Sequence, residues 1–144
     1  MTSLTPWIIN VAASDISAGL HRDPGPNSML ISIVDPGSWR PTPKHSFKEQ
    51  HNFEFLDIEA TDECFEESWR VSDADAEQLV SLLKRALSEN INVIVHCFVG
   101  ICRSGAVCEV GVTMGFQDEF TYRIPNTLVK SKMLKVLEGG LNLC

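Results

Sequence analysis

Short runs rich in apolar and β-branched residues recur along the sequence, and each predicts a β-strand. The runs lie at residues 7–13, 29–34, 53–58 and 91–95. Polar caps followed by apolar residues at helical spacing predict helices at 14–20, 73–90, 104–114 and from 126 onward. The helix at 73–90, which opens with the capping box of Ser72 and Asp75, leads directly into the fourth strand. A right-handed strand–helix–strand connection is therefore the expected topology.

A long connection joins the second and third predicted strands. It begins with the turn signal Asp35-Pro36-Gly37 and contains two further prolines. Its basic residues are Arg40, Lys44, His45 and Lys48. We interpret this connection as a solvated surface loop whose basic residues balance an acidic protein. The alternative is a rim that faces a substrate, because functional loops often have this length and composition.

The fourth predicted strand ends on His96 and Cys97, and Arg103 follows six residues after the cysteine. The apolar run before this pair is typical of a strand buried on both faces of a parallel sheet, and sites on such sheets lie at the carboxyl ends of the strands. A helix that begins near the arginine turns the peptide N–H groups of residues 98–103 inward. Together with the helix dipole, these groups form a nest for an anion.

Cys97 is expected at the base of this nest, where the positive field favours its thiolate, the nucleophilic form. Arg103 adds a planar fork that holds two oxygens of a phosphoryl group and the charge that develops on it. Gly100 permits a backbone geometry that other residues resist. The alternative interpretation is a buried, unreactive cysteine between a strand and a helix, with Arg103 on the surface.

A histidine and a cysteine, five further residues and then Arg-Ser resemble the active-site loop of the cysteine-dependent protein phosphatases. The closest likeness is to the small dual-specificity branch of the protein tyrosine phosphatase superfamily, and it extends from about residue 53 to residue 137. It implies a single phosphatase domain over residues 1–144 with an α/β fold, a three-layer sandwich in which helices flank a central, mostly parallel sheet. It also implies a phosphate-binding loop made of Phe98, Val99, Gly100, Ile101, Cys102 and Arg103.

The same resemblance implies roles for individual residues. Cys97 is the nucleophile, which forms a phosphocysteine intermediate, and Arg103 binds the phosphoryl group. Ser104 resembles the hydroxyl residue that hydrogen-bonds the catalytic sulfur and helps the thiolate to leave in the second step. His96 resembles the histidine that orients the cysteine loop through hydrogen bonds. Without the motif, Ser104 is an ordinary serine at a helix N-terminus and His96 is a buried core histidine.

The mechanism also needs an acid, because an alkoxide or phenoxide leaves far faster when a carboxylic acid protonates it. The segment at residues 55–62 resembles the strand and loop that deliver this acid in dual-specificity phosphatases, and it assigns the role to Asp62. Asp57 is the second choice, because alternation along the strand turns its side chain outward. Glu59 and Glu63 are expected to be solvated charges.

Composition narrows the functional class. With 144 residues and 44% hydrophobic content, the chain is long enough to bury its own core. Neither a signal peptide nor a membrane-spanning run stands out, which favours a cytoplasmic protein. The net charge of −7 disfavours nucleic acid and anionic membranes as partners. The five cysteines indicate neither a disulfide scaffold nor a zinc site, so no metal and no cofactor are expected.

Two of these cysteines lie near the predicted site. Cys102 stands where a serine is common in the family, immediately before Arg103. A second thiol there, or at Cys64 near the acid loop, would trap an oxidised Cys97 as a disulfide. The alternative is that both are passive small residues.

The predicted substrate is a phosphorylated protein or peptide that carries phosphotyrosine, phosphoserine or phosphothreonine. The loop residues Phe98, Val99 and Ile101 are apolar, and the chain is acidic, which disfavours phosphoinositides and RNA 5′ ends. A small phosphorylated metabolite or an RNA 5′ end stays open as a substrate. Two other classes also stay open, a catalytically silent phosphate-binding module and a rhodanese-like sulfur carrier. Asp62 argues against the first of these classes, and the Arg-Ser ending argues against the second.

Overall fold

The structure is a computed structural model that describes residues 5–59 and 69–142. Within these ranges five strands form one sheet, in the order β3-β2-β4-β1-β5. Their bounds are β1 (Trp7–Ala12), β2 (Ser28–Val34), β3 (Glu49–Glu54), β4 (Asn92–Cys97) and β5 (Gln117–Asp118). Every neighbouring pair runs parallel. The expected, mostly parallel sheet is confirmed, and it is parallel throughout.

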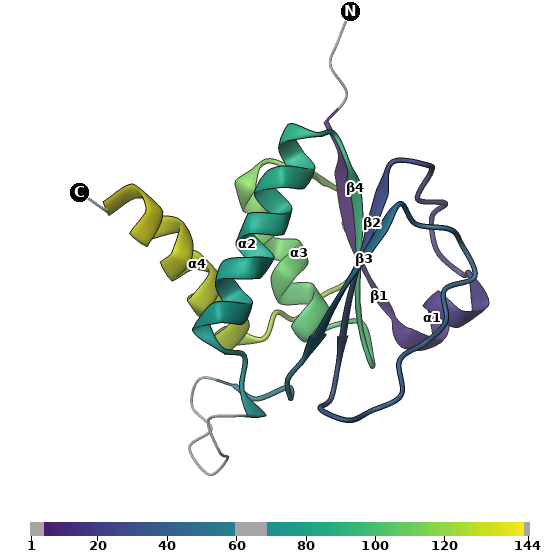
Figure 1. The fold of residues 1–144 in the computed structure, drawn as a ribbon, viewed down its shortest axis with the longest axis horizontal. Helices are drawn as coiled ribbons and strands as arrows, with labels where there is room; N and C mark the ends of the chain where they lie inside the picture. The colour runs from purple at the N-terminus through teal and green to yellow at the C-terminus, as the bar shows by residue number, and fades with distance from the viewer. Residues whose placement is uncertain (1–4, 60–68, 143–144) are drawn as a thin grey trace, which may run out of the picture.

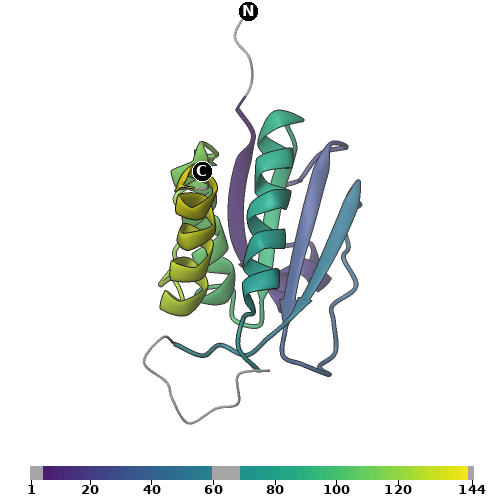
Figure 2. The same cartoon turned by 60° about the vertical axis from the view of Figure 1, so that its left-hand side comes forward.

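Helices cover both faces of this sheet, which makes three layers (Figure 1). Their bounds are α1 (Ala13–Ala18), α2 (Asp73–Ser88), α3 (Arg103–Met114) and α4 (Thr127–Asn142). Figures 1 and 2 show α2 and α3 on one face with α4 beside them, and α1 on the other face. The predicted three-layer α/β sandwich is therefore confirmed. Within the two described ranges, no helix is long and apolar enough to cross a membrane.

The central strands are buried on both faces, as their continuous apolar sequences predict. Successive side chains of β4 contribute to different cores: Val93 and Val95 face α2 and α3, whereas Ile94 joins the cluster around α1. All of these side chains are excluded from solvent. Burial on both sides fixes the register of β4, and with it the position of the loop that follows Cys97.

Two predicted helix caps are present. Ser72 Oγ accepts a hydrogen bond from the Asp75 N–H at 2.9 Å, and the Ser72 N–H donates to Asp75 Oδ2 at 3.1 Å, which completes the capping box of α2. At the start of α4, Asn126 Oδ1 accepts from the Val129 N–H at 2.9 Å. These bonds satisfy backbone donors that a helix N-terminus leaves unpaired.

Three local predictions were wrong. The third strand, β3, spans Glu49–Glu54 rather than residues 53–58. It is an edge strand whose residues before Phe53 are exposed or half-buried, so they carry no apolar signal. The short strand β5 was not predicted, because two residues give no periodicity. α1 begins at Ala13 rather than at Ser14, and its N-cap residue makes no side-chain cap hydrogen bond.

Candidate active site

The loop after β4 surrounds the sulfur of Cys97 with hydrogen-bond donors. The Gly100 N–H donates to Sγ at 3.3 Å and the Ser104 N–H at 3.5 Å. Ser104 Oγ lies 3.2 Å from the same atom. Cys97 is buried, and α3 begins at Arg103. The sulfur therefore lies at a helix N-terminus among donors that favour a negative charge on it.

The backbone at Gly100 is the most constrained point of this loop. Its φ of 82° lies in the left-handed region. A Cβ built there would lie 2.3 Å from the backbone nitrogen of Ala12, so no larger residue fits without a shift of β1. The Gly100 carbonyl accepts from Asn10 Nδ2 at 2.7 Å, and the Phe98 carbonyl accepts from the Ala13 N–H at 3.2 Å. The end of β1 thus holds the loop closely.

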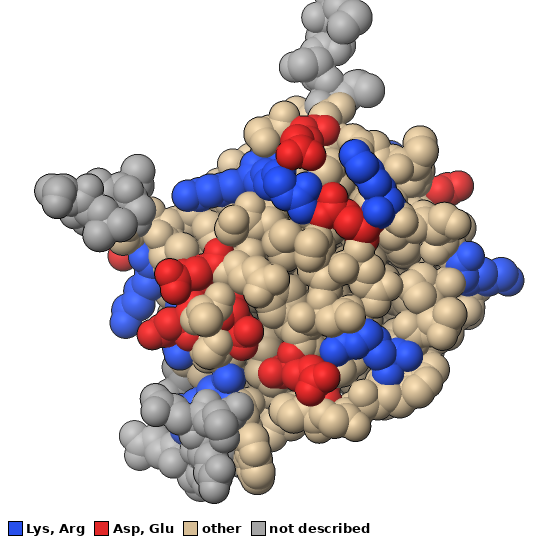
Figure 3. Space-filling view, viewed as in Figure 1, with Lys and Arg blue, Asp and Glu red and all other residues tan. Residues whose placement is uncertain are grey.

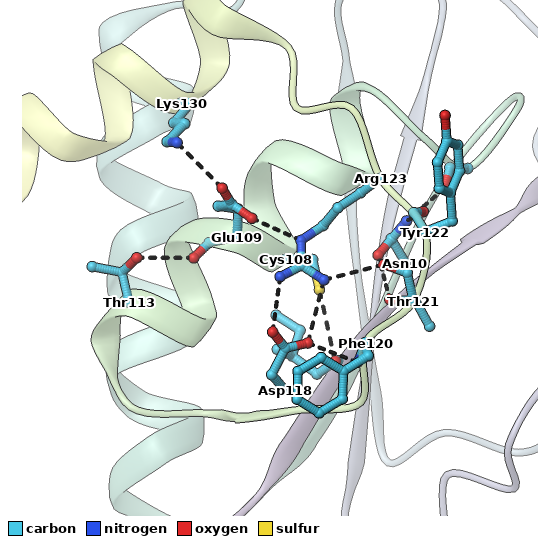
Figure 4. Close-up of polar contacts among 12 residues, drawn as sticks. Asn10, Cys108, Glu109, Thr113, Asp118, Phe120, Thr121, Tyr122, Arg123 and Lys130 are labelled. Atoms are coloured by element: carbon cyan, nitrogen blue, oxygen red, sulfur yellow. Dashed lines mark hydrogen bonds and ion pairs between the residues drawn. The ribbon is translucent and has the colours of Figure 1, made fainter.

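The opposite side of the loop is held by the segment between β5 and α4. The Ile124 N–H donates to the Ile101 carbonyl at 3.1 Å, and the Asn126 N–H donates to the Cys102 carbonyl at 2.9 Å. Figure 4 shows the contacts that fix this segment, in which Arg123 lies between acidic side chains of α3 and β5. Two different parts of the chain therefore support the cysteine loop.

Arg103 reaches back across the carboxyl edge of the sheet, and its side chain is only 6% exposed. Its Nη1 donates to Asp35 Oδ1 at 2.7 Å and to the Phe55 carbonyl at 2.8 Å. Its buried Nε has no hydrogen-bond partner among the described residues. Nη1 of the guanidinium is therefore anchored, while Nε is a donor that could take an anion as its partner.

Asp35 was not predicted as a site residue. The Asp-Pro-Gly sequence indicates a turn, and this signal accounts for the aspartate without any ligand. The pairing with Arg103 joins residues 68 positions apart, so no local pattern reveals it. Parallel strands bring the two residues together, because the ends of β2 and β4 meet at the same edge of the sheet.

His96 lies beneath the loop in a buried polar chain. Its Nε2 is 2.5 Å from Ser32 Oγ, which also accepts from Arg40 Nη1 at 2.8 Å. Its Nδ1 lies 3.4 Å from the carbonyl of Cys97. Burial, together with the positive charges of Arg40 and Arg103, lowers the pKa of His96 to about 4, although the contact with the Cys97 carbonyl acts in the opposite direction. A neutral imidazole at physiological pH fits a residue that orients the loop.

The contacts of Arg40 help to distinguish the two interpretations of the long connection between β2 and β3, a surface loop and a rim that faces a substrate. Its guanidinium turns inward to Ser32 and also forms an ion pair with Glu54 at 3.6 Å. Elsewhere in the connection, His45 Nε2 lies 3.1 Å from the Gly19 carbonyl and Lys48 Nζ donates to Asn27 at 3.4 Å. These residues make contacts within the protein, and they do not form a common basic rim.

The start of the acid-bearing segment lies beside the loop. Asn126 Nδ2 donates to Asp57 Oδ1 at 2.6 Å and to the Ile58 carbonyl at 3.1 Å. Asp57 is exposed and follows the end of β3, so the alternation expected for a strand does not apply to it. Glu59 is not the solvated charge that we expected, because it accepts a hydrogen bond from the Thr127 N–H at 2.8 Å. Asp62, Glu63 and Cys64 lie outside the described residues.

Cys102 is half-buried and precedes Arg103 at the start of α3. Burial raises the pKa of its thiol, and the nearby carboxylate of Asp57 raises it further. Its thiol is therefore held in the protonated form at neutral pH. Among the described residues, no three His, Cys, Asp or Glu side chains gather as a metal site.

No protein-family model matches the sequence, and a search of curated proteins finds no match. Solved structures do resemble it. Human DUSP28 superposes with a TM-score of 0.62 at 16% sequence identity, over 96% of each chain. A human tyrosine phosphatase-like serine/threonine/tyrosine-interacting protein gives a TM-score of 0.62 at 14% identity, over 93% of each chain. The chain therefore shares the α/β fold of these two structures, a protein tyrosine phosphatase-like fold, as the resemblance in the sequence implies.

Proposed function

We propose that this protein hydrolyses phosphate monoesters in phosphorylated proteins through a phosphocysteine intermediate, as a cysteine-dependent phosphatase of the tyrosine or dual-specificity type. The observation that carries the proposal is the set of donors around Cys97. Gly100 and Ser104 direct hydrogen bonds at the sulfur, and Arg103 ends the same loop with an Nε that has no partner among the described residues. A thiolate and a phosphoryl group are the two anions that such donors stabilise.

In the first step, the Cys97 thiolate attacks phosphorus while the bond to the ester oxygen breaks, and Asp62 gives its proton to the departing oxygen. Arg103 and the loop amides hold the non-bridging oxygens. In the second step, the Asp62 carboxylate takes a proton from water, which attacks phosphorus and breaks the sulfur–phosphorus bond. Ser104 Oγ, 3.2 Å from the sulfur, stabilises the thiolate that leaves. Phosphate is released, and the enzyme returns to its starting state.

A protein substrate fits the charge of this chain better than RNA does. The net charge is −7, and on the face shown in Figure 3 acidic and basic side chains are interspersed over the coloured residues. Recognition of a polyanion relies on many phosphate contacts by lysine and arginine. A single phosphoryl group in a protein needs only the loop and Arg103. Small phosphorylated metabolites and RNA 5′ ends serve as comparison substrates in the tests below.

A second candidate is a phosphate-binding module without turnover. One neighbour of this fold is described as a phosphatase-like interacting protein, so the fold alone does not distinguish catalysis from binding. The nest around Cys97 serves either purpose. A third class, the rhodanese-like sulfur carrier, requires no acid and turns over thiosulfate rather than a phosphate ester.

The deciding experiment is hydrolysis of p-nitrophenyl phosphate in EDTA by the wild type, Cys97→Ser and Cys108→Ser. Cys108 is the matched control, because burial raises its pKa to about 11 and its thiol donates to the Ile8 carbonyl. We expect Cys97→Ser to lose more than about a thousandfold in rate and to retain phosphate binding, since its nest remains. Cys108→Ser should stay active. A wild type that binds phosphate without turnover supports the binding module, and turnover of thiosulfate supports the sulfur carrier.

Leaving groups test the proposed acid. Asp62→Ala should slow phenyl phosphate about a hundredfold more than p-nitrophenyl phosphate, because only the poorer leaving group depends on protonation. Asp57→Ala is the matched control and should slow both substrates alike. Equal loss for both substrates in Asp62→Ala, or selective loss in Asp57→Ala, would reject Asp62 as the acid.

A further inference from the structure

An apolar groove of about 760 Å³ opens beside the cysteine loop. One wall is α1, which contributes small side chains such as Ser14 and Ser17. The other wall is the turn after β2, which contributes Ser38 and Trp39, and Phe98 lies at the edge nearest the cysteine loop. Of the residues that line the groove, only Asp35 and Phe98 also belong to the candidate active site described above.

Two residues connect the groove to the nest around Cys97. Phe98 belongs to the cysteine loop, and its carbonyl is fixed to the start of α1 by the Ala13 N–H at 3.2 Å. Asp35 lines the groove and also holds Arg103 at 2.7 Å. A phosphoryl group bound by Arg103 therefore places its neighbouring groups at the mouth of the groove. The groove is continuous with the site and not a separate surface.

The lining identifies the chemistry of its occupant. Phe98 is 75% exposed and Trp39 is 73% exposed, which leaves two large aromatic side chains in contact with water beside the site. Among the described residues that line the groove, Asp35 alone is charged, and Arg103 already pairs with it. Burial of an apolar group against such a surface is favourable, and its described lining has no positive charge that would bind a second anion.

This chemistry favours a peptide over the other phosphorylated ligands. A nucleic acid or a phosphoinositide brings further phosphates, which require basic residues, and the described lining contains no lysine or arginine. A peptide brings neutral side chains and a main chain whose polar groups match hydroxyls. Ser14, Ser17 and Ser38 supply such hydroxyls along both walls.

We propose that this groove is a specificity subsite, which binds a large apolar side chain next to the phosphorylated residue of a peptide substrate. The inference rests on the proposed function, because it assumes that the loop holds the phosphoryl group. Trp39 and Phe98 are the residues that contact the apolar side chain, and the hydroxyls of α1 and the turn face the peptide main chain.

The test uses phosphotyrosine peptides with a neutral background of Gly, Ser and Ala, in which a single Phe is moved through the positions on each side of the phosphotyrosine. For the wild type, we expect kcat/KM to rise about tenfold over the all-neutral peptide at one position or at two neighbouring positions. Trp39→Ala should lose this preference. Ser17→Trp, which fills the groove from an exposed helical position, should lose it too.

Both variants should hydrolyse p-nitrophenyl phosphate at the wild-type rate, because that substrate does not reach the groove. Tyr122→Ala is the matched control, since Tyr122 is 70% exposed and lies outside the groove lining. It should keep the preference for Phe. A flat response to Phe in the wild type, or a preference that survives both groove variants, overturns the subsite.

The same peptides are bound to Cys97→Ser and followed by fluorescence anisotropy, which separates this inference from the proposed function. A wild type without any turnover refutes the phosphatase, yet a tenfold preference for Phe in Kd that Trp39→Ala removes still establishes the subsite. If Cys97→Ser alone binds all the peptides with the same Kd, the subsite is refuted, whether or not the wild type is active. Tighter binding of a 5′-phosphorylated RNA or a phosphoinositide vesicle than of every peptide refutes it as well.

Discussion

Two largely buried arginines, Arg103 and Arg123, differ in how their hydrogen-bond donors are satisfied. All three nitrogens of Arg123 have partners: Nε donates to Glu109, Nη2 to Asp118 and Nη1 to Asp118 and the Thr121 carbonyl (Figure 4). Arg103 uses only Nη1, and its Nε has no partner among the described residues. Among the described residues, Arg103 pairs with a single carboxylate, that of Asp35, whose side chain is 47% exposed.

This difference in hydrogen bonding is what we expect if Arg123 has a structural role and Arg103 has a functional one. A buried donor without a partner costs about 1–3 kcal/mol, so a fold retains one where a ligand completes it. Around Arg123, hydrogen bonds from the guanidinium lower the pKa of Glu109 and of Asp118, which keeps the cluster balanced in charge. Near Arg103, burial lowers the pKa of His96 to about 4, and the charges of Arg40 and Arg103 act in the same direction.

The largest effect is expected for Arg103→Lys, which keeps the charge and removes the planar fork. Turnover of p-nitrophenyl phosphate should fall by about a thousandfold, because a point charge cannot hold two oxygens of the transition state. Arg123→Lys is the matched variant and should change kcat/KM less than about threefold. Steady-state kinetics on both proteins test the comparison, and equal losses in the two would contradict it.

Arg123→Met should reverse this pattern. It leaves Glu109 and Asp118 without their main partner, and both carboxylates are partly exposed, so we expect a loss of about 2 kcal/mol in the free energy of unfolding. Turnover per folded molecule should remain within a few-fold of wild type. Urea unfolding followed by circular dichroism measures the loss. An unchanged urea midpoint would show that these ion pairs do not stabilise the fold.

The burial of His96 next to the positive charges of Arg40 and Arg103 predicts a pH dependence of stability. The pKa of His96 is about 4 in the folded protein and 6.5 when unperturbed, so the unfolded chain binds the proton more readily. The stabilisation is complete above pH 6.5 and is lost as the pH falls toward 4. At pH 5 it amounts to a loss of about 2 kcal/mol relative to pH 7.5. Urea unfolding at both pH values tests this, and His96→Asn should lose most of the difference.

The features that could be predicted from the sequence are those that depend on residues close together in the chain. Cys97, Gly100 and Arg103 lie close together in the sequence, so one motif indicated both the nest and the residues in it. The caps at Ser72 and Asn126 were equally local. Contacts between distant segments were not predictable. Asp35 meets Arg103 only through the parallel register of β2 and β4, and the groove combines α1 with a distant turn. β3 was misplaced because an edge strand carries a polar sequence. The assignment of Asp62 stays a prediction.

The smallest effect is expected at Asp35. Substitutions there separate two effects of its carboxylate on Arg103, the orientation of Nη1 and the negative charge. Asp35→Asn keeps an acceptor for Nη1 and removes the negative charge, so orientation is kept and repulsion of phosphate is reduced. Inorganic phosphate should therefore inhibit about threefold to tenfold more tightly, with kcat little changed.

Asp35→Ala removes the acceptor as well, and we expect kcat to fall about tenfold because only the Phe55 carbonyl then positions Nη1. Asp118→Asn, the corresponding change beside Arg123, should leave the inhibition constant of phosphate unaltered. If both Asp35 variants weaken phosphate inhibition equally, the carboxylate acts through orientation alone, and its charge does not affect the ligand.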